Sequence, residues 1–258
     1  MGLHRRRASG RCCRMRGYDR SMASRLHFVR SDGSAVEVAW TDTSDGDFHI
    51  DAAPDALSER RARVMDGHWA VVRQVHGNAV AEAGDVLAAD TAPEADGVIT
   101  ATVGQPISVQ GADCAPIAFI TDTGPIGVAH AGWRGLANGI ISEVHEQLNG
   151  QDATIEHVVV GPVICTNCYE FGASDLDQVA AELGDVVRAT TPEGTTALDM
   201  RAGIIAAFDD IDVTNVDFVG GCPSCDNTGF SHRARTDPQR HCLVARLIDD
   251  EASGEGAP

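Results

Sequence analysis

Short apolar runs, each bounded by Gly, Pro or Asp, dominate the middle of the chain. Four of them follow one another as DGVITAT, PISVQGADC, PIAFITD and PIGVAHAG. Because runs of this length between turn residues are typical of buried strands, we predict consecutive buried strands here. An opening hairpin is predicted at LHFVRSD and AVEVAW around the turn SDGS, and further strands are predicted at HWAVVRQVHG, IEHVVVGPV and VDFVGG.

Helical patterns occur at four places between and after these strands. The segments are PDALSERRARVMDG from Pro54 to Gly67, then Leu136–Leu148, SDLDQVAAELG and MRAGIIAAFDD. In the second segment the apolar residues share one face and Gly150 provides the stop. Strands clustered in the middle with helices after them, and no linker of distinct composition, predict an α+β fold with one domain.

The two ends of the chain differ in composition from the rest. Residues 1–21 hold seven of the twenty arginines but no apolar stretch that would make them a secretory or twin-arginine signal. We interpret them as a basic leader that is disordered or lies upstream of the true start, with Met22 as that start. The domain then spans residues 22–248, and the acidic tail 249–258 is predicted to be disordered.

Net charge and composition exclude several classes of protein. The net charge of −18 at pH 7 repels phosphate, so we expect neither nucleic acid nor an anionic membrane as a partner. The absence of lysine excludes a Walker phosphate loop and a Schiff-base lysine. No apolar run approaches the roughly 18 residues of a membrane span, and we expect a cytoplasmic protein. Its eight cysteines are then expected to be thiols, ligands or a nucleophile rather than structural disulfides.

Three polar residues stand at the ends of predicted strands: His76, Cys114 and His130. Each alone is more typical of a structural residue, but two imidazoles and one thiol form a set that leaves zinc an open fourth position. The same residues without metal can form a Cys114 nucleophile with His130 as its base. Their separation in the sequence does not decide between these hypotheses. Asp113 directly precedes Cys114, and neighbouring side chains of a strand point to opposite faces. Asp113 is therefore more typical of an orienting or structural carboxylate than of a ligand.

Basic and aromatic residues near this set are candidates for substrate binding. Arg134 in GWRG can hold a phosphate or carboxylate while Trp133 stacks on a base or ring, or the two can form a stacked pair inside the fold. The segment FSHRARTDPQR concentrates basic residues in an acidic chain, namely His232, Arg233, Arg235 and Arg240. It is either a surface loop or a pocket for an anionic group.

Two CxxC pairs follow predicted strands, Cys165 with Cys168 and Cys222 with Cys225. Two such pairs can make a closed zinc site of four thiolates, and one pair near a strand can be a redox couple. Neither pair opens a clear βαβ unit, and the H-x-E with P-C-x-x-C pattern of zinc deaminases is absent. The sequence therefore favours structural metal binding or plain packing over catalysis.

The motifs RQVHG, ADGVIT, GADCAP, IGVAHAGWRG, CYEFG, LDM and FSHRAR together resemble the laccase-domain family, also called the multicopper polyphenol oxidase or peptidoglycan editing factor family. The likeness runs from about Arg73 to about Arg246. It implies a single α+β domain with mixed β-sheets covered by helices, similar to the cysteine hydrolase architecture. It also implies that His76, Cys114 and His130 bind one zinc ion and are the catalytic residues. This chain departs from the family with Cys165 in place of a glycine and His232 in place of a tyrosine.

The resemblance implies phosphorolysis of adenosine, inosine and methylthioadenosine to the base and ribose 1-phosphate or its methylthio analogue, together with adenosine deamination. Its partners are then a purine nucleoside and phosphate, for which Arg134, Arg233 and Trp133 are candidate contacts. Alternatives are a cysteine or metal hydrolase that edits peptidoglycan precursors, and a binding module without activity. A copper polyphenol oxidase is disfavoured because no two of the ten histidines lie two residues apart, as H-x-H copper ligands require.

Overall fold

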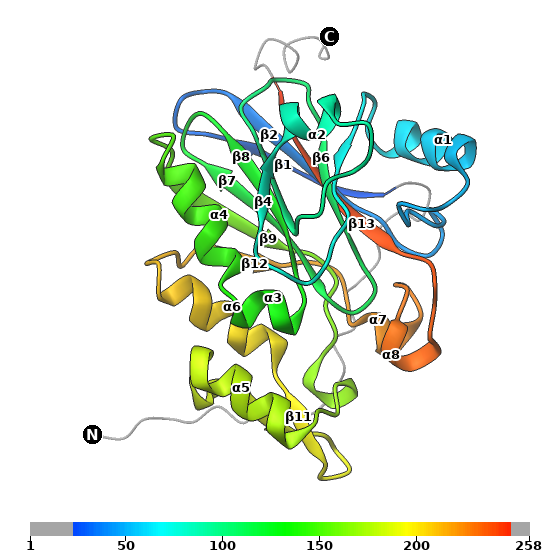
Figure 1. Cartoon of the computed structure of the whole chain (residues 1–258), viewed down its shortest axis with the longest axis vertical. Helices are drawn as coiled ribbons and strands as arrows, with labels where there is room; N and C mark the ends of the chain where they lie inside the picture. The colour runs from blue at the N-terminus through cyan, green and yellow to red at the C-terminus, as the bar shows by residue number, and fades with distance from the viewer. Residues whose placement is uncertain (1–22, 249–258) are drawn as a thin grey trace, which may run out of the picture.

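Two β-sheets packed face to face form the centre of the structure, a computed structural model that describes residues 23–248 (Figure 1). The leader 1–21 and the tail 249–258 lie outside the described residues. The five-stranded sheet has the order β1-β2-β13-β6-β3, and the six-stranded sheet has the order β12-β9-β7-β8-β5-β4. Strands of the first sheet are β1 (Ser24–Val29), β2 (Ala35–Trp40), β3 (Ala70–Val71), β6 (Ile107–Gly111) and β13 (His241–Ile248).

The remaining elements complete the second sheet and its helical cover. Strands of the six-stranded sheet are β4 (Val80–Glu82), β5 (Gly97–Thr100), β7 (Ala115–Thr121), β8 (Ile126–Ala131), β9 (Ile155–Val160) and β12 (Val216–Phe218), while β10 (Arg188–Thr190) and β11 (Thr196–Leu198) pair separately. The α-helices are α1 (Pro54–Val64), α2 (Ala83–Ala88), α3 (Trp133–Ala137), α4 (Ile140–Asn149), α5 (Ala173–Leu183), α6 (Met200–Asp209), α7 (Pro223–Asp226) and α8 (His232–Arg235). Two short 3₁₀ helices are η1 (Thr166–Cys168) and η2 (Asp185–Val187).

Alternation along the strands creates three apolar clusters and so fixes the order of the layers. On β7, Ile117 and Phe119 face a cluster shared with α4, α5 and α6, whereas Ala118 and Ile120 face the five-stranded sheet. On β13, Leu243 faces the other sheet while its neighbours pack toward α1 and Trp69. The helices α4 and α6 therefore cover one outer face and α1 the other, as Figure 1 shows. Mixed sheets covered by helices are the predicted fold class.

The predicted hairpin and the central strands are confirmed, whereas one predicted strand and one predicted helix are altered. Only Ala70–Val71 of HWAVVRQVHG is a strand, because the chain beyond it turns around a buried carboxylate described below. The helix predicted over Leu136–Leu148 is two helices, since Gly139 between them takes the left-handed conformation at φ 83°. The predicted stop at Gly150 is confirmed. Helix α1 ends at Val64, so Gly67 lies past its end as predicted.

No helix in the described part of the chain is both long and apolar enough to cross a bilayer.

His241, at the start of β13, is a fully buried titratable group. Neither ring nitrogen makes a hydrogen bond within residues 23–248. Burial and the nearby charge of Arg240 lower the pKa of His241 to about 4. An unfolded chain with an ordinary histidine pKa near 6.5 binds this proton first, so acid favours unfolding.

We therefore expect the contribution of His241 to the free energy of unfolding to be complete above about pH 6.5. As the pH falls toward 4, this residue should lower that free energy by up to about 1.4 kcal/mol per pH unit. Urea unfolding at a series of pH values across this range measures the change in the free energy of unfolding with pH. This change should be smaller in His241→Gln, whereas His68→Gln, at an exposed position, should show the same change as the wild type. Parallel curves for both variants would contradict the assignment.

Candidate metal-binding active site

Three predicted ligands meet where the ends of both sheets come together. His130 lies on β8, Cys114 lies in the turn between β6 and β7, and His76 lies in the loop between β3 and β4. One ligand atom from each residue lies within 4.8 Å of the other two. The Sγ atom of Cys114 is 3.9 Å from Nε2 of His76, and the two imidazole rings meet edge to face with centroids 4.9 Å apart. The structure thus brings the predicted trio together as one possible metal site.

A buried carboxylate, Asp96, organises two of these ligands. It lies directly before β5, opposite His130 on β8, and its Oδ1 atom is 2.8 Å from Nδ1 of that histidine. The backbone amides of Val75, His76 and Gly77 all donate to the same carboxylate, at 3.2, 3.0 and 2.7 Å. Burial alone would raise the pKa of Asp96, but these hydrogen bonds outweigh it and the pKa lies below its usual range. Asp96 is therefore ionised and fixes both histidines.

The loop that presents His76 is held in an uncommon backbone conformation. His76 has φ 62°, in the left-handed region that few non-glycine residues adopt. Three consecutive amides converging on one carboxylate require this tight turn. Opposite the turn, Gly132 leaves room for the ligands: a Cβ there would lie 2.7 Å from Cδ2 of His76 and 3.2 Å from Sγ of Cys114. The first glycine of HAGWRG, Gly132, is thus explained by the close approach of the His76 and Cys114 side chains to its backbone.

Electrostatics favour a thiolate and an imidazolium before any metal binds. Burial raises the pKa of Cys114 on its own, but His130 and His76 outweigh it and bring the pKa to about 6. Burial likewise lowers the pKa of His130, but the Cys114 thiolate and Asp96 raise it to about 9. At neutral pH the pair therefore carries one negative and one positive charge. A thiolate ready for coordination is present, and a cation would displace the imidazolium proton.

The residues fit a zinc ion by the chemistry of the donor set. Two imidazoles and one thiolate are borderline-soft ligands that suit zinc and leave a fourth position open. His130 uses Nδ1 for Asp96, which leaves Nε2 for a metal, and this carboxylate–histidine arrangement is usual behind a metal-binding histidine. His76, Cys114 and His130 are thus the residues that would hold the ion, and Asp96 would orient one of them.

Asp113 supports the site from behind rather than contributing a ligand. Its φ of 93° turns the chain sharply before Cys114. Its carboxylate accepts hydrogen bonds from Oγ of Ser224 at 3.1 Å and from the amide of Arg233 at 2.7 Å. The side chain is buried and ties the turn to α7 and α8. This agrees with the structural role predicted for the carboxylate.

A cavity of about 460 Å³ opens beside the three ligands. This volume lies in the range of pockets that take small molecules. His76, Cys114 and His130 line it, together with Gln110 from the five-stranded sheet. Basic side chains form much of the wall, namely His49, Arg73, Arg134, His232 and Arg240. One carboxylate, Asp51, also lines it and pairs with Arg73 at 2.9 Å. The cavity thus combines a metal-ligand set with several basic side chains in an acidic protein.

Among the arginines of this wall, Arg134 has the guanidinium with the fewest polar partners in the described chain. Its side chain makes no hydrogen bond or ion pair with another residue of the described chain, and its Cζ atom lies 4.1 Å from the Trp133 ring centroid. Trp133 itself meets Phe171 edge to face at 5.3 Å and is not among the described residues that line the cavity. Trp133 and Arg134 thus form the stacked pair, and the arginine also reaches the cavity. A substrate contact by either residue stays a prediction.

The other predicted basic residues are divided between structure and cavity. Arg235 binds the carboxylate of Asp237 and the carbonyl of Gly229, so it holds its own loop together. Arg240 reaches the cavity but donates to two nearby carbonyls. Arg233 lies 4.7 Å from the Tyr169 ring centroid, and it is not among the described residues of the cavity wall. A substrate contact by Arg233 stays a prediction.

Asp96, the carboxylate on which this site depends, is not among the residues predicted from the sequence. Its signal was present, since Asp96 stands in the motif ADGVIT directly before a predicted buried strand. A carboxylate at the end of a fully apolar strand needs partners, but the sequence alone does not show which. The four cysteines of the CxxC pairs form a second group of close sulfur atoms, apart from the trio.

The fold is an α/β domain that carries a possible metal site, and the same fold is known from solved structures. A Neisseria meningitidis protein of the DUF152 family superposes with a TM-score of 0.71 over 88% of this chain and 99% of that chain, at 20% identity. YlmD from Geobacillus stearothermophilus superposes with a TM-score of 0.69 over 84% of this chain and 93% of that one, at 24% identity. These similarities show the fold.

The chain belongs to the family described as multi-copper polyphenol oxidoreductase laccase, which matches residues 27–246. The predicted resemblance is thereby confirmed. A purine nucleoside phosphorylase of Mycobacterium tuberculosis is 32% identical over 72% of this chain and 77% of its own length. A Corynebacterium glutamicum protein of the same name is 29% identical over 88% and 96%. An adenosine deaminase from an unknown prokaryotic organism is 31% identical over 52% and 55%.

Proposed function

We propose that this protein is a zinc-dependent purine nucleoside enzyme. It cleaves adenosine, inosine and methylthioadenosine with phosphate to the base and ribose 1-phosphate or its methylthio analogue, and it deaminates adenosine. The observation that carries the proposal is the convergence of His76, Cys114 and His130 on a cavity that also presents Arg134. The relatives named as phosphorylases and as a deaminase support the same chemistry.

Zinc in this donor set supplies Lewis acidity and lowers the pKa of a bound water to about 7. The residues of the chain do the rest. Asp96 keeps the Nδ1 proton on His130 and so fixes the ring that faces the cavity. Arg134 offers its planar guanidinium to phosphate, and Trp133 holds that guanidinium in place by stacking.

In phosphorolysis a phosphate oxygen forms a bond to C1′ of the ribose while the bond from C1′ to the base breaks. The electron pair of that bond leaves with the base, which takes up a proton. In deamination the oxygen of water bonds to C6 of adenine and ammonia leaves. One cavity can serve both reactions, because each needs a bound purine nucleoside and a nucleophile beside it.

The two activities are tested by chromatography of adenosine and inosine incubated with zinc-loaded protein, with and without phosphate. We expect bases only with phosphate, inosine from adenosine with or without it, and loss of all products in Cys114→Ala. Arg134→Gln should raise the KM for phosphate about tenfold, because a hydrogen bond to a charged group contributes about 1.5 kcal/mol. Deamination by Arg134→Gln should be nearly unchanged.

Arg63→Gln is the matched control, since the same substitution then removes an exposed arginine of α1 that does not line the cavity. Zinc-loaded protein that leaves both nucleosides untouched would refute the proposal. Equal effects of Arg134→Gln and Arg63→Gln on phosphate would remove the role assigned to Arg134.

A second candidate is a cysteine hydrolase that acts on cell-wall precursors. The favouring observation is the Cys114 thiol 3.9 Å from Nε2 of His76. His130 and His76 lower the pKa of this thiol to about 6, which favours a reactive thiolate beside an imidazole. This hypothesis expects iodoacetamide to modify Cys114 in step with the loss of amidase activity. An unreactive thiol in zinc-loaded protein with nucleoside activity would favour the first candidate.

A further inference from the structure

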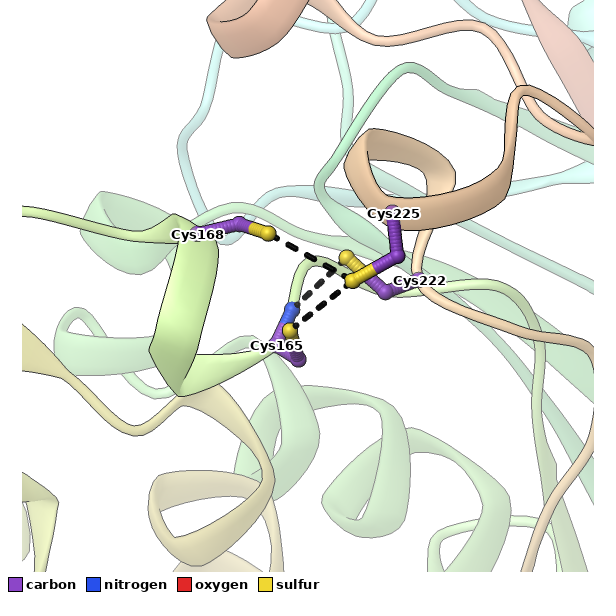
Figure 2. A group of neighbouring side chains, drawn as sticks. All are labelled: Cys165, Cys168, Cys222 and Cys225. Atoms are coloured by element: carbon purple, nitrogen blue, oxygen red, sulfur yellow. Dashed lines mark hydrogen bonds between the residues drawn. The ribbon is translucent and has the colours of Figure 1, made fainter. Parts of the chain in front are cut away.

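Four cysteines outside the active site gather into one cluster. Cys165 directly precedes η1, which follows β9, and Cys168 is the last residue of η1. Cys222 is the N-cap of α7, and Cys225 lies within that helix. Figure 2 shows their sulfur atoms pointing toward one another from these two turns. Sγ of Cys225 lies 3.5 Å from Sγ of Cys165 and 3.4 Å from Sγ of Cys168, and all four sulfurs are within 4.8 Å of one another.

Both CxxC segments have the same local geometry. The amide of Cys168 donates to the carbonyl of Cys165 at 3.0 Å, and the amide of Cys225 donates to the carbonyl of Cys222 at 3.0 Å. Each bond closes a tight turn that places the two sulfurs of a pair on one side. The amide of Cys165 also donates to Sγ of Cys222 at 3.2 Å, which joins the turns (Figure 2). An amide directed at sulfur favours the thiolate form.

Distances between the sulfurs suit a metal better than disulfides. A disulfide joins two sulfurs at about 2.05 Å and would pair Cys225 with only one of its two near neighbours. Four thiolates at about 2.3 Å from a central zinc ion stand about 3.8 Å from each other. Here Sγ of Cys225 lies 3.4 and 3.5 Å from two neighbouring sulfurs, and no two of the four sulfurs are more than 4.8 Å apart. Apolar packing does not account for the cluster either, since Cys225 is exposed.

We propose that Cys165, Cys168, Cys222 and Cys225 bind one zinc ion as a closed tetrathiolate site, separate from the active-site trio. All four positions of the ion are then taken by protein, which makes the site structural rather than catalytic. Two CxxC turns facing each other supply the usual ligand spacing for such a site. The cation also balances thiolates that would otherwise repel one another at this distance.

The ion would connect segments that are distant in sequence. It would hold α7 against the turn that leads from β9 to α5. From α7, Ser224 reaches the carboxylate of Asp113, which precedes the active-site Cys114. Because structural zinc contributes its binding energy to folding, this second site would stabilise the segment 222–235 behind the cavity.

Metal analysis of the full chain purified with zinc tests the proposal. We expect two zinc ions per chain in the wild type, one in Cys225→Ser and one in Cys114→Ala. Asn167→Ala, an exposed position between the cysteines of the first pair, should keep both ions. Hydrogen exchange over residues 222–235 should become faster in Cys225→Ser and not in Asn167→Ala.

One zinc ion per chain in the wild type, retained in Cys225→Ser and lost in Cys114→Ala, would overturn the proposal, as would iron in place of zinc. If Cys225→Ser does not fold, modification of the wild-type protein by iodoacetamide tests the site instead. The reagent should modify the exposed Cys225 only after a chelator removes zinc, as measured by peptide mass spectrometry. Modification at the same rate with and without zinc would contradict the site. None of these measurements depends on the substrate of the active site.

Discussion

Asp96→Asn should both destabilise the protein and weaken metal binding at the active site. The buried carboxylate accepts three backbone amides and the Nδ1 proton of His130, and an amide side chain has too few acceptor positions for four donors. Each buried donor left unsatisfied costs about 1–3 kcal/mol, so we expect the free energy of unfolding to fall by about 3 kcal/mol. Urea unfolding of the metal-free protein measures this loss.

The same substitution removes the negative charge that orients and polarises His130. Loss of such a partner behind a metal-binding histidine typically costs about 10–100-fold in metal affinity. Competition with a chromophoric zinc chelator measures that affinity. Glu94→Gln provides the control, because it removes a carboxylate at an exposed position close by in the sequence. Wild-type zinc affinity in Asp96→Asn would show that the carboxylate does not govern the site.

The prediction of the fold from sequence succeeded where local pattern and tertiary packing agree. Strands such as β7 and β8 are buried on both faces, so their uninterrupted apolar runs between turn residues identify them. β13 also lies inside a sheet, but its sequence HCLVARLI contains an arginine and follows a basic loop, and it is not among the predicted strands. Its position between β2 and β6 is set by pairing across most of the chain.

The three candidate ligands were predictable from the sequence, but the contacts that support them were not. His76, Cys114 and His130 carry chemistry in their residue types, and glycine or proline turns mark them as strand-end positions. Whether they meet depends on the left-handed turn at His76 and on the amides that bind Asp96. No periodicity shows such contacts, because they arise from backbone atoms that every residue shares. The cysteine cluster was ambiguous for the same reason, since spacing alone does not bring two CxxC pairs together.

Gly132→Ala should impair the active site while leaving the fold almost intact. The added Cβ would lie 2.7 Å from Cδ2 of His76, a distance at which one of the two groups must move. His76 is exposed and lies on a loop, so its ring is the group expected to move. Zinc ligands tolerate displacements of only about 0.2 Å, and we expect at least about a tenfold loss of zinc affinity. Backbone strain is not expected, since Gly132 has φ −73° and ψ 163°, which alanine adopts readily.

The measurement is nucleoside turnover as a function of zinc concentration, beside the urea unfolding midpoint of the metal-free protein. Gly132→Ala should require more zinc for half-maximal activity and should unfold within about 0.5 kcal/mol of the wild type. Gly84→Ala is the matched control, because a Cβ there meets no atom within 4 Å and lies on the helix α2. If Gly132→Ala binds zinc as tightly as the wild type, His76 is not a zinc ligand. Cys114 and His130 would then be only two protein ligands, whereas a catalytic zinc site takes three from the protein and keeps the fourth position open.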